Sequence, residues 1–71
     1  MNVRSDVAEL STLRTVLEDV TRRVEAVAER LAQTPDSAVT SELFSAERSL
    51  VTARRAIESA SSTLSELPDL V

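Results

Sequence analysis

Two runs of apolar residues with a seven-residue repeat, one on each side of Pro35, constrain the fold of this chain most strongly. We label the repeat a to g. In both runs the apolar residues alternate in steps of three and four, which is typical of helices that pack along a seam. The predicted a positions are Val3, Leu10, Leu17, Val24, Leu31, Leu43, Leu50, Ile57 and Leu64. The predicted d positions are Asp6, Leu13, Val20, Val27, Val39, Ala46, Ala53, Ala60 and Leu67.

One interruption separates the two runs. Proline has no backbone N–H and crowds the preceding turn, so Pro35 is not expected inside one continuous helix. It suits the first position of a new helix, with Thr34 as the N-cap or, if the loop is longer, Ser37. Ser5, with acidic residues after it, predicts where the first helix begins, and Pro68 predicts where the second ends.

These signals predict the domain organisation. The chain of 71 residues is long enough for one small domain, which we expect to span residues 1–71. Within it, the first helix is predicted at about residues 5–33, the turn at about 34–36 and the second helix at about 36–67.

The two seams are predicted to fit each other when the chain folds at the proline. An antiparallel arrangement brings a residues of one helix against d residues of the other, for example Leu17 against Ala53 and Ile57 against Leu13. In the middle of the pair, every second layer sets a large residue against an alanine, which lets the helix axes approach. The sequence therefore predicts an all-α fold, an antiparallel two-helix hairpin with coiled-coil-like heptads.

A hairpin of this size has a small core, because so short a chain buries only about 60% of its unfolded surface. A second copy is the simplest source of further helices, so we expect a homodimer that forms a four-helix bundle. The residues that flank the seams are the candidates for the interface with a partner. Val16 and Ala56 lie on one side, and Phe44, Val51 and Ala28 lie on the other. The second group is interpreted either as a wider core stripe of the homodimer or as a patch for another helical protein.

The chain lacks the residues of the common catalytic and metal sites. It contains no histidine, cysteine, lysine or glycine. This composition excludes nucleophiles activated by histidine, zinc sites with nitrogen or sulfur ligands, and glycine-rich phosphate loops. Glu25 and Glu29 form an acidic pair, but their b and f positions are predicted to face water. We therefore expect no enzymatic activity, no catalytic residue, no cofactor and no metal.

Arginine supplies all eight basic side chains of the chain. Arg48, Arg54 and Arg55 lie close together in the second predicted helix, and Arg14 shares the e position with Arg54 on the facing helix. Arg14 and Arg54 each have a glutamate four residues further on, which is predicted to pair with the guanidinium group. The alternative interpretation is that these arginines bind an anion, a nucleic-acid phosphate or an acidic partner helix.

This layout resembles the Rop type of RNA-binding bundle, a short hairpin that dimerises with alternating small and large core layers. The resemblance rests on the heptad pattern over most of the chain, and it implies a nucleic-acid-binding dimer that uses Arg14, Arg48, Arg54 and Arg55. The net charge of −4 argues against nucleic acid as a partner, because electrostatic binding of nucleic acid needs a basic face.

The leading functional hypothesis is a non-enzymatic helical module for protein–protein interaction or assembly, which associates with itself and docks a partner protein by helix packing. The alternative is a Rop-like dimeric regulator that binds nucleic acid through its arginines.

No stretch approaches the run of about 18 apolar residues that a membrane span needs, so we expect no membrane partner. The first ten residues contain no apolar signal core, and we expect a cytoplasmic protein. The lysine-free, arginine- and alanine-rich composition suggests a bacterium with a high-GC genome.

Overall fold

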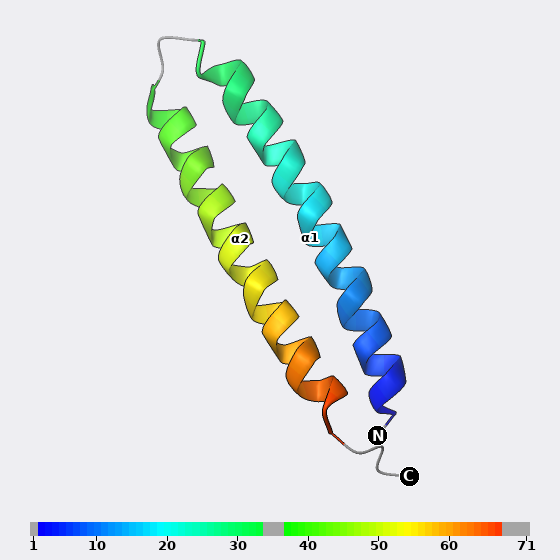
Figure 1. Cartoon of the computed structure of the whole chain (residues 1–71). Helices are drawn as coiled ribbons and strands as arrows, with labels where there is room; N and C mark the ends of the chain where they lie inside the picture. The colour runs from blue at the N-terminus through cyan, green and yellow to red at the C-terminus, as the bar shows by residue number, and fades with distance from the viewer. Residues whose placement is uncertain (1, 34–36, 68–71) are drawn as a thin grey trace.

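The structure, a computed structural model, describes residues 2–33 and 37–67. It contains two α-helices, α1 (Val3–Leu31) and α2 (Ser37–Ser65), which run antiparallel and side by side (Figure 1). The start of α1 and the end of α2 lie at the same end of the molecule, whose Cα atoms extend over 58 × 14 × 13 Å. The predicted all-α, two-helix hairpin is confirmed.

Helix α1 begins two residues before the predicted start at Ser5. Asn2 caps it, because the Asn2 side chain accepts a hydrogen bond of 3.1 Å from the backbone N–H of Ser5. The backbone N–H of Asp6 donates to the Asn2 carbonyl oxygen at 3.1 Å, which closes the first turn. Asparagine is among the strongest N-cap residues, and the Asp6 carboxylate in the first turn adds a favourable interaction with the helix dipole.

The helix ends also differ by one or two residues from the predicted ones. Helix α1 ends at Leu31, and the N–H of Ala32 still donates to the Ala28 carbonyl oxygen at 2.8 Å. Helix α2 ends at Ser65, after which bonds to residues three positions back tighten the chain, with Glu66 and Leu67 as donors at 3.2 and 3.1 Å. The predicted caps and breaks at the turn and the C-terminal end lie outside the described residues or side chains: Thr34, Pro35, Ser37 and Pro68.

The face that each helix turns toward the other consists of the a and e positions. Every a and e residue that the structure describes in the two helices is buried or half-buried. In α1 these residues are Val3, Val7, Leu10, Arg14, Leu17, Thr21, Val24, Ala28 and Leu31. In α2 they are Thr40, Leu43, Glu47, Leu50, Arg54, Ile57, Ser61 and Leu64. The core of the hairpin is therefore a narrow strip between the helices, apolar at a and largely polar at e.

The predicted role of the d positions as the second core row is wrong. The d residues Leu13, Val39, Ala46, Ala53, Ala60 and Leu67 are exposed, and Val20 and Val27 are only half-buried. The helices are rotated so that e, rather than d, lies beside a in the contact. The e residues of α1 include Thr21 and Ala28, which are 7% and 0% exposed, and such small side chains let the helix axes come close. Ala53, predicted to lie in a core layer against Leu17, is exposed in this hairpin.

Candidate interaction surfaces

The rotation of the helices leaves their apolar d rows on one face of the hairpin. Each residue turns an α-helix by about 100°, so a contact centred between a and e leaves d on one side and b on the other. Because the two helices are antiparallel, the d rows of both point to the same side. We call this surface the apolar face. With the neighbouring g residues it comprises Leu13, Val16, Val20 and Val27 of α1 and Val39, Ala46, Ala53, Ala56 and Ala60 of α2.

The apolar face is open to solvent along most of its length. Leu13, Val16 and Val39 are 43%, 50% and 39% exposed, and the four alanines are exposed as well. Exposed apolar residues that repeat along one face of both helices are typical of a contact with another protein. Two of the interface candidates predicted from the sequence, Val16 and Ala56, lie on it.

The two halves of the apolar face differ in shape. On α1 the face is built from leucine and valine, whereas on α2 it is mostly alanine. A shallow depression of about 420 Å³ lies along the outer side of α2, lined by Ser45, Arg48, Ser49, Thr52, Ala53 and Ala56, and it borders the apolar face at the two alanines. Because leucine and valine side chains stand higher than alanine, the face presents a ridge on α1 and a trough on α2.

Charges of both signs border the apolar face near the turn. At the g positions, α1 carries Arg23 and Arg30 and α2 carries Glu42, and all three are exposed. Asp19 forms ion pairs within α1, at 3.3 Å to Arg22 and 3.7 Å to Arg23. Such exposed pairs contribute little to stability, so the charges at this edge matter chiefly for the choice and orientation of a partner.

The opposite face carries a smaller apolar patch among charges. Phe44 is 39% exposed and Val51 is half-buried, and both lie at b positions of α2. The b row of α1 on the same side includes Glu18 and Glu25. Ala28, predicted to extend this patch, is fully buried between the helices and is not part of any surface. Of the three residues predicted for this patch, Phe44 and Val51 thus lie on the surface and Ala28 does not.

The arginine cluster predicted from the sequence divides into two groups. The Nε atom of Arg14 lies 3.8 Å from Glu18 Oε1, and the Nε atom of Arg54 lies 3.6 Å from Glu58 Oε1, which confirms the predicted intrahelical pairs. Both Nε atoms are buried and have no hydrogen-bond partner among the described residues. Arg14 also lines a hollow between the helices together with Glu58.

Arg48 and Arg55 form the second group, exposed on the outer surface of α2. They share the f row, one heptad apart, on the side of α2 away from α1. The four predicted arginines therefore do not form one basic surface, because two of them are held against carboxylates in the contact between the helices.

A pair of carboxyl groups lies between the helices where sequence reasoning predicts only solvated acids. The side chains of Glu25 on α1 and Glu47 on α2 lie close enough to share a hydrogen bond when one of the two carboxyls holds a proton. Partial burial, together with the hydrogen bond to Glu25 and its charge, raises the pKa of Glu47 above its ordinary value of 4.5. The nearby charge of Glu29 acts in the same direction, and that of Arg48 opposes it. No sequence signal marks this pair, because it depends on the a and e contact between the helices, which puts Glu47 in the interface.

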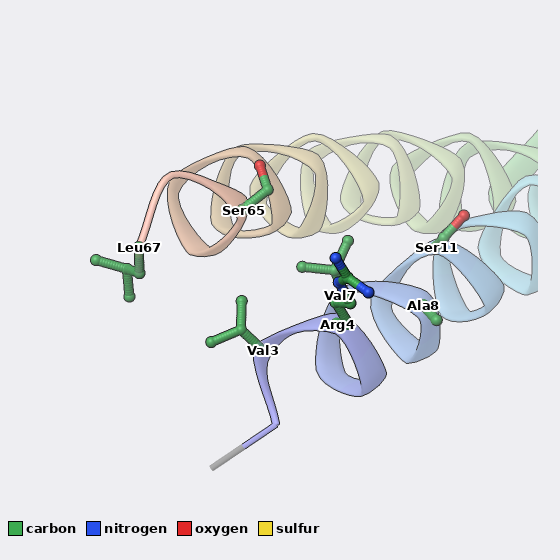
Figure 2. Close-up of a pocket in the computed structure, with 7 residues that line it drawn as sticks. All are labelled: Val3, Arg4, Val7, Ala8, Ser11, Ser65 and Leu67. Atoms are coloured by element: carbon green, nitrogen blue, oxygen red, sulfur yellow. The ribbon is translucent and has the colours of Figure 1, made fainter. Parts of the chain in front are cut away.

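The end of the hairpin away from the turn is hollowed between the two helices. Val3, Arg4, Val7, Ala8, Ser11, Ser65 and Leu67 line this hollow of about 420 Å³ (Figure 2). Val3 and Leu67 lie on opposite sides of it, and the Ser65 hydroxyl points away and donates to the Ser62 carbonyl oxygen at 2.9 Å. Among the described residues, the lining offers apolar contact and one charged group, Arg4, without a pair of groups that could transfer a proton.

Among the described residues, no three acidic side chains gather in a way that could hold a metal ion. Neither of the two described helices is long and apolar enough to cross a membrane. The features that stand out are thus the apolar face, the paired arginines and the shared carboxyls. Comparisons with models of protein families, with curated proteins and with solved structures find no match for this chain.

Proposed function

We propose that this chain is a non-enzymatic assembly module that associates with itself through the apolar face and docks a partner protein by helix packing. The observation that supports it most is the position of the d rows. Their leucine, valine and alanine side chains follow a heptad repeat, yet they lie outside the contact between α1 and α2. In a four-helix bundle every helix has two neighbours, so a hairpin needs a second apolar row for the other hairpin.

The physical reason for association is the thin core. Within the hairpin, no large side chain among the described residues is fully buried. Covering apolar surface contributes roughly 25 cal/mol per Å², and a second hairpin would cover the d rows as well as one side of the a rows. Self-association would thereby supply the burial that a lone hairpin lacks. On composition, we place this homodimer in the cytoplasm of a bacterium.

Two adjacent residues of α1 give a matched test of this proposal. Val16 lies on the apolar face and is half exposed, so a charge there should leave the hairpin itself intact. Thr15 is also exposed but lies at f, away from the apolar face. We expect Val16→Glu to be monomeric by light scattering at micromolar concentration, while Thr15→Glu keeps the dimer of the parent chain. Equal masses for both variants would contradict a role of this face in assembly.

The alternative function, binding of nucleic acid, is supported by the exposure of Arg48 and Arg55 on one row of α2. In a dimer, two copies of this row would supply four arginines. The measurement that separates the alternatives is titration with duplex RNA and DNA at several salt concentrations. Phosphate contacts make the affinity fall steeply with salt, whereas an apolar protein contact does not weaken in this way. Binding that is lost in Arg48→Gln and Arg55→Gln would favour the alternative.

A further inference from the structure

The shape of the apolar face determines how two copies fit together, if the proposed self-association is correct. We propose that two hairpins pair face to face about a two-fold axis parallel to the helices, so that α1 of each copy packs on α2 of the other. The turns of both copies then lie at the same end of the bundle. The occupant of the apolar face is thus a second copy in one defined orientation.

The size of the side chains favours this orientation. Two face-to-face arrangements of identical hairpins are symmetric. An axis parallel to the helices sets the ridge of Leu13, Val20 and Val27 on the alanine trough of the partner. An axis perpendicular to the helices sets ridge on ridge and trough on trough, which crowds one half of the interface and leaves the other half empty. Close packing of the core disfavours both defects, so ridge in trough is the better fit.

The direction of the helices is compatible with the same orientation. Rotation about an axis parallel to the helices keeps each helix direction, so α1 lies antiparallel to α2 of its own chain and to α2 of the partner. All neighbouring helices in the bundle are then antiparallel, as in up-down-up-down bundles with short loops.

The register of the contact follows from the carboxyl pair. The close approach of Glu25 and Glu47, together with the a and e contact between the helices, shows which residues of α1 and α2 lie at about the same height in the hairpin. Rotation about an axis parallel to the helices does not shift a residue along that axis. Residues of α1 and α2 that lie side by side within one hairpin therefore also lie at the same height between the two copies. Nine residues before Glu25 is Val16, and nine residues after Glu47 is Ala56. These two g residues therefore face each other across the interface, a larger apolar side chain against a small one.

The charges at the edge agree with this register. Five residues after Glu25 is Arg30, and five residues before Glu47 is Glu42, both exposed at g positions. Within one hairpin, the g rows of α1 and α2 lie on opposite outer edges. Between copies they come to the same edge, where Arg30 of each chain meets Glu42 of the other. Opposite charges so placed favour this orientation over others, even where they add little affinity.

Disulfide trapping tests the contact, and the absence of cysteine from the chain gives a clean background. Val16→Cys and Ala56→Cys are made separately, unfolded together, refolded and oxidised. We expect a cross-linked dimer from the mixture and none from either variant alone. Because both positions are exposed on the hairpin, neither substitution should disturb its fold. A cross-link in Val16→Cys alone, or no cross-link in the mixture, would overturn the proposed orientation.

A spin label at Gln33, introduced through Gln33→Cys, gives a second and independent readout. Neighbouring helices in a bundle lie about 8–10 Å apart, so two labels at the same end should be separated by less than about 30 Å. Labels at opposite ends would be about 44 Å apart or more, the length of a 29-residue helix. The short distance supports the proposal and the long one overturns it.

Light scattering on the same samples shows whether a failed prediction concerns only the orientation or self-association itself. A dimer with the long distance refutes only the orientation, whereas a monomer refutes self-association and the orientation with it.

Discussion

At the scale of single residues, we expect the contact between Glu25 and Glu47 to lower the stability of the folded chain at neutral pH. The raised pKa of Glu47 means that the folded chain holds this proton more tightly than the unfolded chain, in which the ordinary value is 4.5. The free energy of unfolding therefore falls as the pH rises from about 4.5 through the folded pKa, and the contribution of the shared proton is lost above it. The two carboxylates then repel each other in the contact between the helices.

Glu47→Gln should remove this cost, because the amide keeps a hydrogen bond to Glu25 without a charge. We expect the variant to melt at a higher temperature than the parent at pH 7. The parent should gain stability as the pH falls from 7 toward 4.5, and the variant should gain less. Glu66→Gln, an exposed glutamate outside the helix contact, is the control for the change in net charge. Parallel pH profiles for parent and Glu47→Gln would show that the carboxyl pair does not contribute.

Single residues also show which contacts could be predicted from the sequence. The pairs of Arg14 with Glu18 and of Arg54 with Glu58 were predictable, because a spacing of four residues on one helix fixes the contact without knowledge of the fold. The contact of Glu25 with Glu47 was not, because it depends on how the helices are rotated about their axes. The cap at Asn2 was also missed, since Ser5 and the acids after it offered an equally good start.

At the scale of the helices, the described residues predicted at a are buried or half-buried, whereas most of those predicted at d are exposed. The repeat locates an apolar stripe on each helix but does not say which part of the stripe meets the other helix of the same chain. If one apolar stripe makes two contacts, some of its residues pack against the other helix of the same chain and the rest are left for a partner. In this hairpin the a and e residues form the internal contact, and the d residues Leu13, Val39 and Ala53 remain on the surface.

Ala53→Leu distinguishes the two contacts. Since Ala53 is exposed in the hairpin, a leucine there should not push α1 and α2 apart. In the proposed dimer the same leucine would fill the trough that receives the partner, and overpacking of this kind typically costs about 1–3 kcal/mol. We expect a weaker dimer by sedimentation, with the helical content of the hairpin retained by circular dichroism.

Ser59→Leu serves as the control for this substitution, because Ser59 is an exposed residue of α2 that lies outside the apolar face. It should leave the dissociation constant of the dimer unchanged. If Ala53→Leu dimerises as tightly as Ser59→Leu, the alanine row is not the receiving surface.

At the scale of the whole molecule, the central claim is that the hairpin is half of a larger bundle. A lone pair of helices leaves its contact strip accessible from two sides, and the apolar face lies along one of them. The two-helix hairpin was predictable from the repeats and the proline. The surface left for a partner was not, because the repeats do not show which row of each stripe the contact within the hairpin leaves exposed.

Sedimentation equilibrium of the unmodified chain tests this claim most directly. The mass of one chain is 7.7 kDa. We expect a mass twice this value at micromolar concentration and a shift toward one chain on dilution, together with a melting temperature that rises with protein concentration. A single-chain mass at all concentrations, with a cooperative melt that does not depend on concentration, would contradict the account, because the hairpin would then be stable with its apolar face uncovered.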